Sequence, residues 1–538
     1  MKMNRFFTSI FLLFLLSVSF VFFSCKSFGG IQKEISPLDY SDSDVLENER
    51  KRISDLMMSE PVEAYWRSIL LGDEKITEEC ANHLEKMTEM ALEEKNYASA
   101  WRYSNSLEVT GYQNRNISFS DIEELFKKDV PGFQKNNKVP ASINEAVKAT
   151  VTVIVDKGIK ITYGMGLPDK VLGSGFFIDE RGYIVTNHHV IADMVDPAYE
   201  GYSRLYIKLP GNEDDKIPAK VIGWDSVTDL ALLKTEYIPE YVLNLGSSSE
   251  LVVGDQINVI GAPLGLEGTL TSGIVSNTKR KLFSNGDVFQ IDASVNSGNS
   301  GGPCIDKDMK VQAVVFAGVL QAQGLNFAIP VEYLKQELPF MYAGGEYNHS
   351  WIGCFGRTKR NGGKKLGAEI QYVMPGSPAR LSGLKKDQVI TSVNGEQINS
   401  VEDLQGYFRS TTPGTIVKLE FEEDEKPLFV YLTKRNGEPA REIYESDLIE
   451  NTFLPLFGMQ LIPASTTSRN TYKIDYVIEG SEADELQFSE NDPLTIKDLK
   501  VDKNDKYILV QIVTKRHKKN LFDVTMVMGT SFDGPNYF

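Results

Sequence analysis

Histidine and cysteine are scarce in this chain, and positive charge is in deficit. Five histidines and four cysteines occur among 538 residues, and no cysteines are paired at the spacing of a zinc site or a disulfide framework. Basic residues number 57 against 74 acidic ones, a net charge of −17 that repels the phosphates of nucleic acids. We therefore expect neither a metal or other cofactor nor a nucleic-acid partner.

The rest of the composition is that of an ordinary folded protein. Hydrophobic residues make up 41% and charged residues 24%, which excludes collagen-like and wholly disordered chains. At roughly 150 residues per domain, the length allows three or four domains.

The start of the chain has the pattern of an export signal. Lys2 and Arg5 precede an apolar run from Phe6 to Phe23, as in a secretory signal peptide. The residues before Cys25 resemble a bacterial lipobox, so we expect residues 1–24 to be removed and Cys25 to be lipidated. The alternative is an uncleaved membrane anchor. Both place the chain outside the cytoplasm, tethered to a membrane on the periplasmic side of a bacterial envelope.

Lipidation of Cys25 would leave Cys80, Cys304 and Cys354 in the mature chain. An odd number of cysteines outside the cytoplasm leaves at least one free thiol or an intermolecular bridge. No cysteine–histidine pair stands out, so we assign these thiols no chemistry.

Two segments precede the β-rich part of the chain. Residues 25–60 are polar and charged and predict a tether, whereas apolar residues recur at helical spacing over residues 61–138. Residues 91–100 loosely resemble a tetratricopeptide hairpin, but a single unit is too few to stack stably. We therefore interpret residues 61–138 as a small helical bundle that packs on its own core.

Short β-branched runs separated by turn residues begin at Val151. Examples are Val151–Val155, Tyr183–Thr186 and Leu230–Leu233. Repeated short strands at turn spacing predict an all-β barrel or sandwich, which we place at residues 139–343. Gly344-Gly345 then forms a linker.

The strongest chemical signal is the run Gly298-Asn299-Ser300-Gly301-Gly302-Pro303. A serine hydroxyl becomes a nucleophile when a base removes its proton, and backbone N–H groups must stabilise the oxyanion that forms. The glycines would let Gly298 and Ser300 present their N–H groups on one side as an oxyanion hole. Taken alone, such a run also occurs in ordinary turns between strands.

A histidine pair and an aspartate complete the requirement. His188-His189 follow one predicted strand and Asp229 precedes another, and the chain order His, Asp, Ser is that of a chymotrypsin-type triad. Spacing does not choose between His188 and His189. Asp225 is a second acidic candidate, although the apolar strand that follows favours Asp229.

Together these segments resemble the HtrA/Deg (high-temperature-requirement) family of trypsin-like serine proteases over roughly residues 140–436. In that family the base directly precedes a valine, so the resemblance places the triad on His189, Asp229 and Ser300. It implies a chymotrypsin-like double β-barrel with serine endopeptidase activity. The ordered motifs are Gly173–Phe176, Thr186–Val190, Thr228–Ala231, Thr271–Ser276, Asp292–Pro303 and Asn326–Pro330.

The resemblance also predicts a specificity pocket. Ser294 stands where trypsin-like barrels have the pocket floor, and it carries no carboxylate, so cleavage after Lys or Arg is not expected. Asn326 and Ala328 belong to a segment that resembles the family's pocket wall, which suits small or medium aliphatic residues. A hydrophobic pocket discriminates weakly among such residues.

Partners follow from the same resemblance. It implies misfolded or signalling envelope proteins as substrates and a homotrimer as the assembly. The segment from Lys157 to Val171 is a short loop in this interpretation, without the long insertion of some family members, so large cages are not expected.

After the linker, Trp351-Ile352-Gly353-Cys354 resembles the carboxylate-binding loop of an HtrA-type PDZ domain, which we place at residues 346–436. Such a loop holds a terminal carboxylate while the bound peptide adds a strand to the sheet edge. Val401–Arg409 is predicted to be the helix that walls the groove. We expect this α+β domain to bind hydrophobic C-terminal peptides and to regulate the protease.

The PDZ pattern returns at an offset of 104 residues, from Gly376 to Gly480. We interpret residues 448–538 as a degenerate PDZ-like domain. Only Leu499–Lys506 stands where the groove helix should lie, about 12 Å of helix with nothing left for its connections. We therefore predict that this domain does not bind C-terminal peptides and acts as a structural brace.

Three functions are compatible with these sequence features. The first is a membrane-tethered serine endopeptidase, the second is a chaperone or peptide-binding scaffold that does not cleave, and the third is a scaffold whose helical region recruits partners. The intact triad favours the endopeptidase, because a retired protease usually loses a triad member.

Overall fold

The computed structural model describes residues 40–112, 118–162, 164–262, 268–283, 286–318, 325–422, 426–464, 470–503, 505–518, 520–534 and 536–538. These residues all belong to one compact unit, and the predicted signal peptide and Cys25 lie outside them. Within these ranges no helix is long and apolar enough to cross a membrane.

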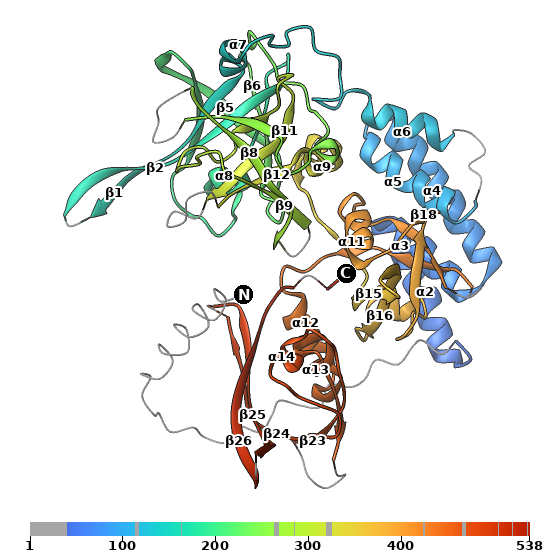
Figure 1. Ribbon diagram of the computed structural model, residues 1–538. Helices are drawn as coiled ribbons and strands as arrows, with labels where there is room; N and C mark the ends of the chain where they lie inside the picture. Colours follow the sequence, from blue (N-terminus) through green and yellow to red (C-terminus); the bar gives the residue numbers. More distant parts are fainter. Residues whose placement is uncertain are drawn as a thin grey trace. The chain divides into compact units, whose positions relative to one another are not determined.

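The described part of the chain opens with helices (Figure 1). Asp42, Asp73, Asn96 and Ser118 act as N-caps, since each side chain accepts a hydrogen bond from an N–H group of the first turn. The helix α3 (Pro61–Leu71) instead begins with a proline, whose missing N–H costs nothing at the first helical position. The helices are α2 (Ser43–Ser59), α3 (Pro61–Leu71), α4 (Glu74–Glu93), α5 (Tyr97–Val109) and α6 (Phe119–Lys128).

These helices share their core with the first PDZ domain. The buried Trp66 stacks on Tyr431, with ring centroids 5.7 Å apart, and its Nε1 donates to the Phe429 carbonyl at 2.9 Å. Ile416 belongs to the same cluster. Most of this cluster still comes from the helices themselves, and a second small cluster consists of helix residues alone. The helical bundle therefore has the expected core, but residues of the first PDZ domain complete it, because helical periodicity reveals an apolar face without revealing everything that covers it.

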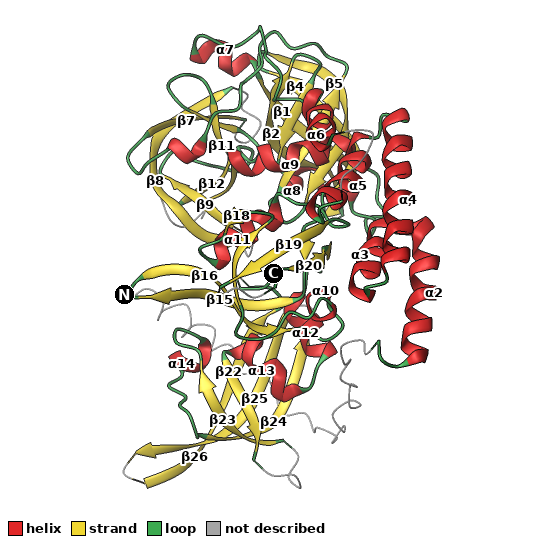
Figure 2. Cartoon of the chain, turned by 90° about the vertical axis from the view of Figure 1, so that its right-hand side faces the viewer, coloured by secondary structure: helices red, strands yellow, loops and turns green. Residues whose placement is uncertain are grey.

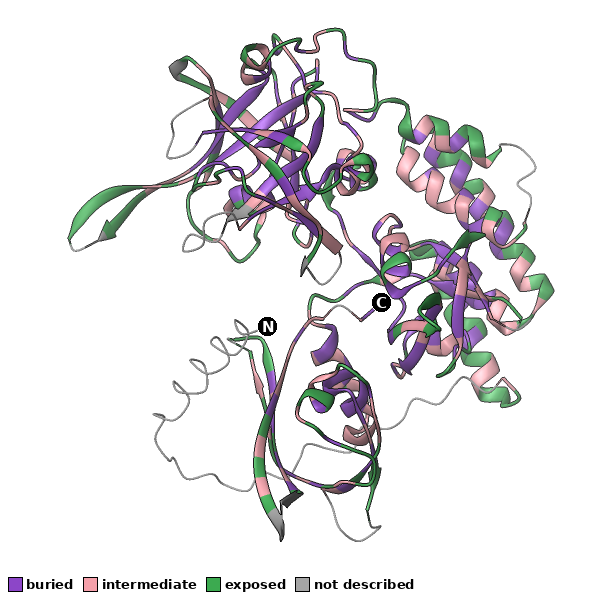
Figure 3. Ribbon diagram, viewed as in Figure 1, coloured by how far each residue is buried: buried purple, intermediate pink, exposed green. Residues whose placement is uncertain are grey.

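The β-rich region forms two closed sheets (Figure 2). In the first, the order β5-β4-β1-β2-β3-β6 is closed by pairing of β5 with β6, and the second is the closed barrel β10-β11-β12-β9-β8-β7. Apolar side chains fill each barrel, and a third cluster contains residues of both, as the buried strands in Figure 3 show. This architecture confirms the predicted double β-barrel.

The strands of the first barrel are β1 (Thr150–Thr162), β2 (Met165–Asp179), β3 (Tyr183–Thr186), β4 (Arg204–Leu209), β5 (Asn212–Asp225) and β6 (Leu230–Thr235). Those of the second are β7 (Gln256–Gly261), β8 (Thr269–Phe283), β9 (Gly286–Ile291), β10 (Pro303–Ile305), β11 (Val311–Gly318) and β12 (Asn326–Pro330). The helices of this region are α7 (Ile143–Lys148), α8 (His188–Val195) and α9 (Val331–Ala343).

The segment from Lys157 to Val171 is not a short loop. β1 and β2 continue through it as an antiparallel ladder up to the pair Thr162↔Met165, and the hairpin projects from the barrel in Figure 1. Its outer part is exposed, with Ile159 at 74% and Ile161 at 77%. The glycines and charged residues of this segment suggested a loop, but ladder pairing between the two strands overrides that local preference.

The first PDZ domain is built on an antiparallel sheet of six strands, in the order β15-β16-β17-β19-β20 with β18 (Glu396–Gln397) paired to β17. The second is built on an antiparallel sheet of five strands, in the order β22-β23-β24-β25-β26. The first has β15 (Cys354–Asn361), β16 (Lys364–Val373), β17 (Val389–Val393), β19 (Ile416–Phe421) and β20 (Leu428–Tyr431), with α10 (Pro378–Leu381) and α11 (Val401–Arg409). The second has β22 (Met459–Pro463), β23 (Thr471–Val477), β24 (Pro493–Asp502), β25 (Tyr507–Lys518) and β26 (Asn520–Ser531), with α12 (Pro439–Ser446), α13 (Ile449–Phe457) and α14 (Glu482–Glu485).

The groove helix differs between the two domains as the sequence predicts. α11 spans Val401–Arg409 and is capped by Ser400. In the second domain β24 ends at Asp502 and β25 begins at Tyr507, so the described residues between these strands hold no helix.

The cysteines of the described chain are buried and unpaired. They are Cys80, Cys304 and Cys354. Burial raises the pKa of the Cys80 thiol to about 11 and that of Cys304 to about 12, so both thiols stay protonated at neutral pH.

Candidate active site

His189 and Asp229 meet at the start of α8. The His189 ring Nδ1 lies 2.7 Å from Oδ2 of Asp229, and the backbone N–H of His189 donates to Oδ1 of the same carboxylate at 2.8 Å. The imidazole remains 47% exposed. A carboxylate held in this way fixes the ring tautomer and leaves Nε2 available as a base.

Asp229 adopts a left-handed backbone conformation, with φ of 60°. Such a conformation is strained for a residue other than glycine and must be held by its surroundings. Here the backbone oxygen of Asp229 accepts hydrogen bonds from Asn187 Nδ2 at 2.8 Å and from the His188 N–H at 3.2 Å. The segment that leads into α8 therefore holds the aspartate by both its backbone and its carboxylate.

The two neighbouring histidines have different surroundings. His188 is half-buried, and this burial lowers the pKa of its ring despite the opposing charge of Asp229. The ring of His189 is the one that contacts the Asp229 carboxylate.

Ser300 follows a tight turn between β9 and β10. The N–H of Asn299 donates to the Asn296 carbonyl at 3.0 Å, and Gly298 in the third position of this turn has φ of 102°. That combination is the type II turn, which favours glycine at its third position. The glycine predicted to supply an oxyanion donor is thus required by the backbone itself.

A buried serine that sequence reasoning left without a role holds this turn. The hydroxyl of Ser174 in β2 donates to the Gly298 carbonyl at 2.6 Å and accepts the Ala262 N–H at 2.9 Å. The backbone oxygen of Ser300 accepts the Ser174 N–H at 2.7 Å. These bonds fasten the turn to both barrels.

The turn also touches the segment that carries the histidines. A Cβ added to Gly301 would lie 2.4 Å from the Thr186 hydroxyl and 3.0 Å from the Asn187 nitrogen. The Ser300 Oγ donates to the Phe316 carbonyl at 3.4 Å. No hydrogen bond joins the described Ser300 and His189, so the proton-transfer contact of a triad is still open in this structure. Catalytic hydrogen bonds are often loose without substrate.

The predicted pocket residues lie in and beside the second barrel. Asn326 donates from Nδ2 to the Ala293 carbonyl at 2.7 Å, and the Ser294 carbonyl accepts the Thr271 hydroxyl at 2.9 Å. Ala328 is fully buried in the core of that barrel.

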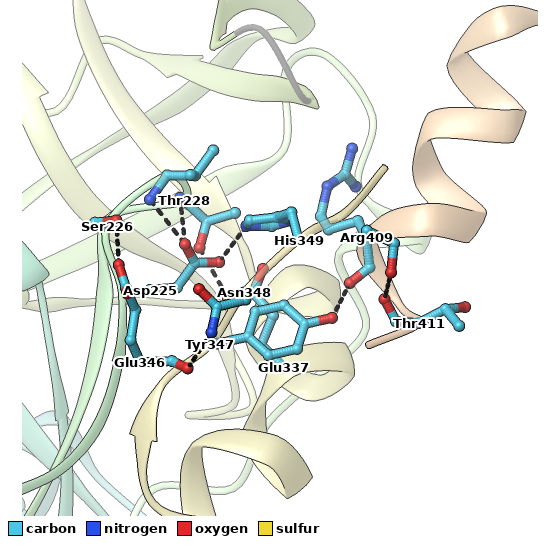
Figure 4. Close-up of polar contacts among 12 residues, drawn as sticks. Asp225, Ser226, Thr228, Glu337, Glu346, Tyr347, Asn348, His349, Arg409 and Thr411 are labelled. Carbon is cyan, nitrogen blue, oxygen red and sulfur yellow. Dashed lines mark hydrogen bonds and ion pairs between the residues drawn. The ribbon is translucent and has the colours of Figure 1, made fainter. Parts of the chain in front are cut away.

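Asp225 anchors the loop that leads to Asp229 (Figure 4). Its fully buried Oδ1 accepts the N–H groups of Val227 at 2.7 Å and Thr228 at 3.2 Å. Its Oδ2 lies 2.7 Å from Nε2 of His349, which is 4% exposed. Because His349 lies between the protease domain and the first PDZ domain in the chain, this contact ties their connection to the loop that leads to Asp229.

Two buried carboxyl groups of this cluster have opposite pKa shifts. Burial and the Asp225 charge raise the pKa of Glu337 well above its ordinary value, while the Thr228 hydroxyl donates to its Oε2 at 2.8 Å. Burial acts against the charged form of Asp225 as well, but the charge and hydrogen bond of His349, together with the hydrogen bonds from Thr228 and Val227, lower its pKa. The cluster thus favours one protonated and one ionised carboxyl group.

The connection reaches the groove helix of the first PDZ domain. The Tyr347 hydroxyl donates to the carbonyl of Arg409, the last residue of α11 (Figure 4). The Ser350 hydroxyl donates to the Thr411 carbonyl. Sequence reasoning missed this cluster, because its hydrogen bonds join residues between 61 and 124 positions apart. Its available signal was His349, one of only five histidines, just after the glycine linker.

The predicted PDZ loop is buried and tightly bent. Trp351, Ile352 and Cys354 are at most 2% exposed. Gly353 has φ of 89°, and a Cβ there would lie 2.2 Å from the Ser377 Cβ, so the loop requires glycine at this position.

Family models match four parts of the chain. A trypsin-like peptidase domain matches residues 173–314, and a PDZ domain matches residues 369–423. A TP0546 family PDZ domain matches residues 440–532, and a domain of unknown function (DUF8517) matches residues 44–127.

Relatives agree with these matches. The chain is 35% identical over 254 residues to a probable periplasmic serine endoprotease, DegP-like, of Hahella chejuensis, covering 45% of this chain and 52% of the relative. It is 40% identical over 260 residues to the protein of the same description in Bartonella henselae, covering 46% and 50%. The chain thus spans about half the length of the curated relatives it matches.

Among solved structures, the HtrA-type protease AlgW with tripeptide is 24% identical, with 55% of this chain and 98% of that chain covered and a TM-score of 0.45. The family-model matches and the relatives confirm the predicted resemblance to HtrA/Deg proteases. The chain carries a trypsin-like peptidase domain followed by PDZ domains.

Proposed function

We propose that this chain is a DegP-like serine endopeptidase that works outside the cytoplasm. The observation that carries the proposal is the 2.7 Å contact between His189 and Asp229, in a domain matched by the trypsin-like peptidase model that also contains Ser300. An imidazole oriented by a carboxylate, together with a serine on a glycine-rich turn, supplies the groups that acyl transfer needs.

The proposed mechanism gives each residue one role. His189 takes the proton of the Ser300 hydroxyl as that oxygen attacks the peptide carbonyl, and then gives the proton to the leaving amine. Asp229 holds the His189 tautomer and stabilises the imidazolium. The N–H groups of Gly298 and Ser300 stabilise the oxyanion. Substrate binding would have to draw the Ser300 Oγ from Phe316 to His189.

The finer features belong to the same proposal. They are the limits of the protease and PDZ domains expected from the sequence, membrane attachment through lipidated Cys25, a substrate pocket at Ser294, Asn326 and Ala328, misfolded or signalling envelope proteins as substrates, and a homotrimeric assembly. The predicted tether at residues 25–60 is not among them, because α2 occupies Ser43–Ser59. Regulation by the first PDZ domain is supported by the hydrogen bonds that lead from α11 through Tyr347 and His349 to Asp225.

The test is covalent labelling of the chain without residues 1–25 by a fluorophosphonate probe, with casein hydrolysis measured in parallel. We expect Ser300 to be labelled, and Ser300→Ala to lose both labelling and hydrolysis, by about three orders of magnitude or more in rate. His188→Ala should keep activity that His189→Ala loses. Full casein turnover by Ser300→Ala would refute the proposal.

The open contact between Ser300 and His189 favours one second candidate, a peptide-binding chaperone that does not cleave. It would be supported if the probe left Ser300 unlabelled even with casein and hydrophobic C-terminal peptides present. Suppression of the aggregation of an unfolded protein by the same sample would then identify the chaperone.

A further inference from the structure

The groove of the first PDZ domain is filled by residues 536–538 of the same chain. The Cys354 N–H donates to the Phe538 oxygen at 2.7 Å, and the Phe538 N–H donates back to the Cys354 carbonyl at 2.9 Å. The Gly356 N–H donates to the Asn536 oxygen at 3.1 Å. Phe355 and Tyr537 face each other as an antiparallel bridge. These residues therefore extend the sheet at its β15 edge.

The helix on the other side of the groove also contacts this segment. Gln405 of α11 donates from Nε2 to the Tyr537 carbonyl at 3.1 Å. Figures 1 and 2 both place the end of the chain beside β15 and α11. The segment thus lies between the edge strand and the groove helix, where an added peptide strand is expected to bind.

Successive side chains of the segment enter two different cores. Phe538 is 2% exposed and belongs to the core cluster of the first PDZ domain, with Ile352, Leu404 and Phe408. Tyr537 belongs to the cluster of the second domain, and its hydroxyl donates to the Pro455 carbonyl at 2.8 Å. Side chains of an extended strand alternate in direction, so this segment joins the two domains.

We propose that residues 536–538 are the built-in ligand of the first PDZ groove, so that any peptide with a hydrophobic C-terminal residue must displace them to bind. This inference deepens the proposed regulation by the first PDZ domain. The loop predicted to receive such a peptide already donates its Cys354 N–H to Phe538, and the apolar pocket already holds the Phe538 ring.

The strength of the competition follows from tethering. A ligand on the same chain acts at an effective concentration of about a millimolar when its connection is short. Against a site of micromolar affinity, this weakens binding of a free peptide by roughly 100-fold or more. A free peptide therefore occupies the groove only when its affinity or its concentration is high enough to displace residues 536–538.

The test measures binding of a fluorescein-labelled peptide with the sequence of residues 531–538 by anisotropy. All proteins carry Ser300→Ala to prevent cleavage, so the result does not depend on whether the chain is a protease. One variant lacks residues 536–538, and a second, full-length variant carries Phe538→Asp. We expect each of them to bind the peptide at least about tenfold more tightly than the otherwise intact chain. The matched control is Val527→Ala, at a side chain of β26 that is 62% exposed, and it should match the intact chain.

Equal affinity in the intact and the shortened chain would overturn the proposal. Loss of the buried Phe538 ring could also unfold the domain, so melting is measured with each titration. If the shortened chain melts early, saturating peptide added in trans should restore its melting temperature. Failure of the peptide to do so would likewise count against residues 536–538 as a groove ligand.

Discussion

The two PDZ domains share their loop framework and differ in their groove. Gly353 and Gly458 have φ of 89° and 79°, and a Cβ on either would lie 2.2 or 2.1 Å from the Cβ of Ser377 or Ser481. Asp387 and Asn491 also repeat each other, with φ of 72° and 70°. The turns that pack each loop against its sheet are therefore retained in both domains.

What the second domain lacks is the wall of a groove. The first domain has α11 beside β15, whereas the second passes from β24 to β25 without a helix in the described residues. The strand β22 instead lies near α13, where Gln460 donates to the Glu450 carbonyl at 3.4 Å. The comparison teaches that the loop framework is retained where the groove helix is not, and we expect peptide binding to depend on that helix.

The largest effect is expected where the first domain joins the protease. His349→Ala removes the imidazole partner of the fully buried Asp225 carboxylate, which keeps only the N–H donors of Val227 and Thr228. Breaking such a buried pair costs about 3–5 kcal/mol. We expect a loss of this size in the free energy of unfolding, measured by urea titration, together with a loss of casein hydrolysis. His349→Gln should recover part of both, because its amide can still donate. Unchanged activity in His349→Ala would show that the catalytic loop does not depend on this connection.

A matched pair of substitutions tests the shared framework. Gly353→Ala and Gly458→Ala each force a left-handed conformation and a clash with a serine Cβ, at a cost of about 3 kcal/mol. Urea unfolding should report similar losses for the two variants. Only Gly353→Ala should also weaken binding of the peptide in the chain lacking residues 536–538. Equal loss of binding in both variants would contradict the division of roles.

A smaller, pH-dependent effect is expected from Glu337. Its pKa is raised in the folded protein, so above its ordinary value of 4.5 the unfolded chain releases a proton that the folded chain keeps. Stability should therefore fall as pH rises toward the folded pKa, by at most about 1.4 kcal/mol per pH unit. In Glu337→Gln this slope should disappear. A slope that persists in the variant would assign it to other groups.

No effect at all is expected from the second groove. Calorimetric titration of the chain lacking residues 536–538 with the hydrophobic peptide should give one site per chain. A second saturable site, removed by substitutions around Met459, would show that the second domain binds peptides without a helical wall.

The residues proposed to be catalytic could be located from the sequence because each lies in a local motif. Strands and turns that the sequence pattern predicts flank His189, Asp229 and the Gly298–Pro303 run. The helix α11 likewise has the predicted limits. The contact between Asp225 and His349 joins residues 124 positions apart. No local sequence pattern encodes a contact between residues so far apart. The same holds for Phe538, which packs in the core of the first PDZ domain, although its position in the sequence suggested only the second domain.

The buried cysteines link folding to the oxidation state of the surroundings. Thiolates, not thiols, attack disulfides, and burial keeps the Cys304 thiol protonated through its pKa of about 12. The folded chain can therefore persist in an oxidising compartment without forming cross-links. An unfolded chain whose Cys25 is lipidated, as we propose, exposes three thiols with ordinary acidity, an odd number that cannot all pair within one chain. Unfolding under oxidising conditions should then end in intermolecular disulfides, which makes denaturation irreversible unless a reductant is present.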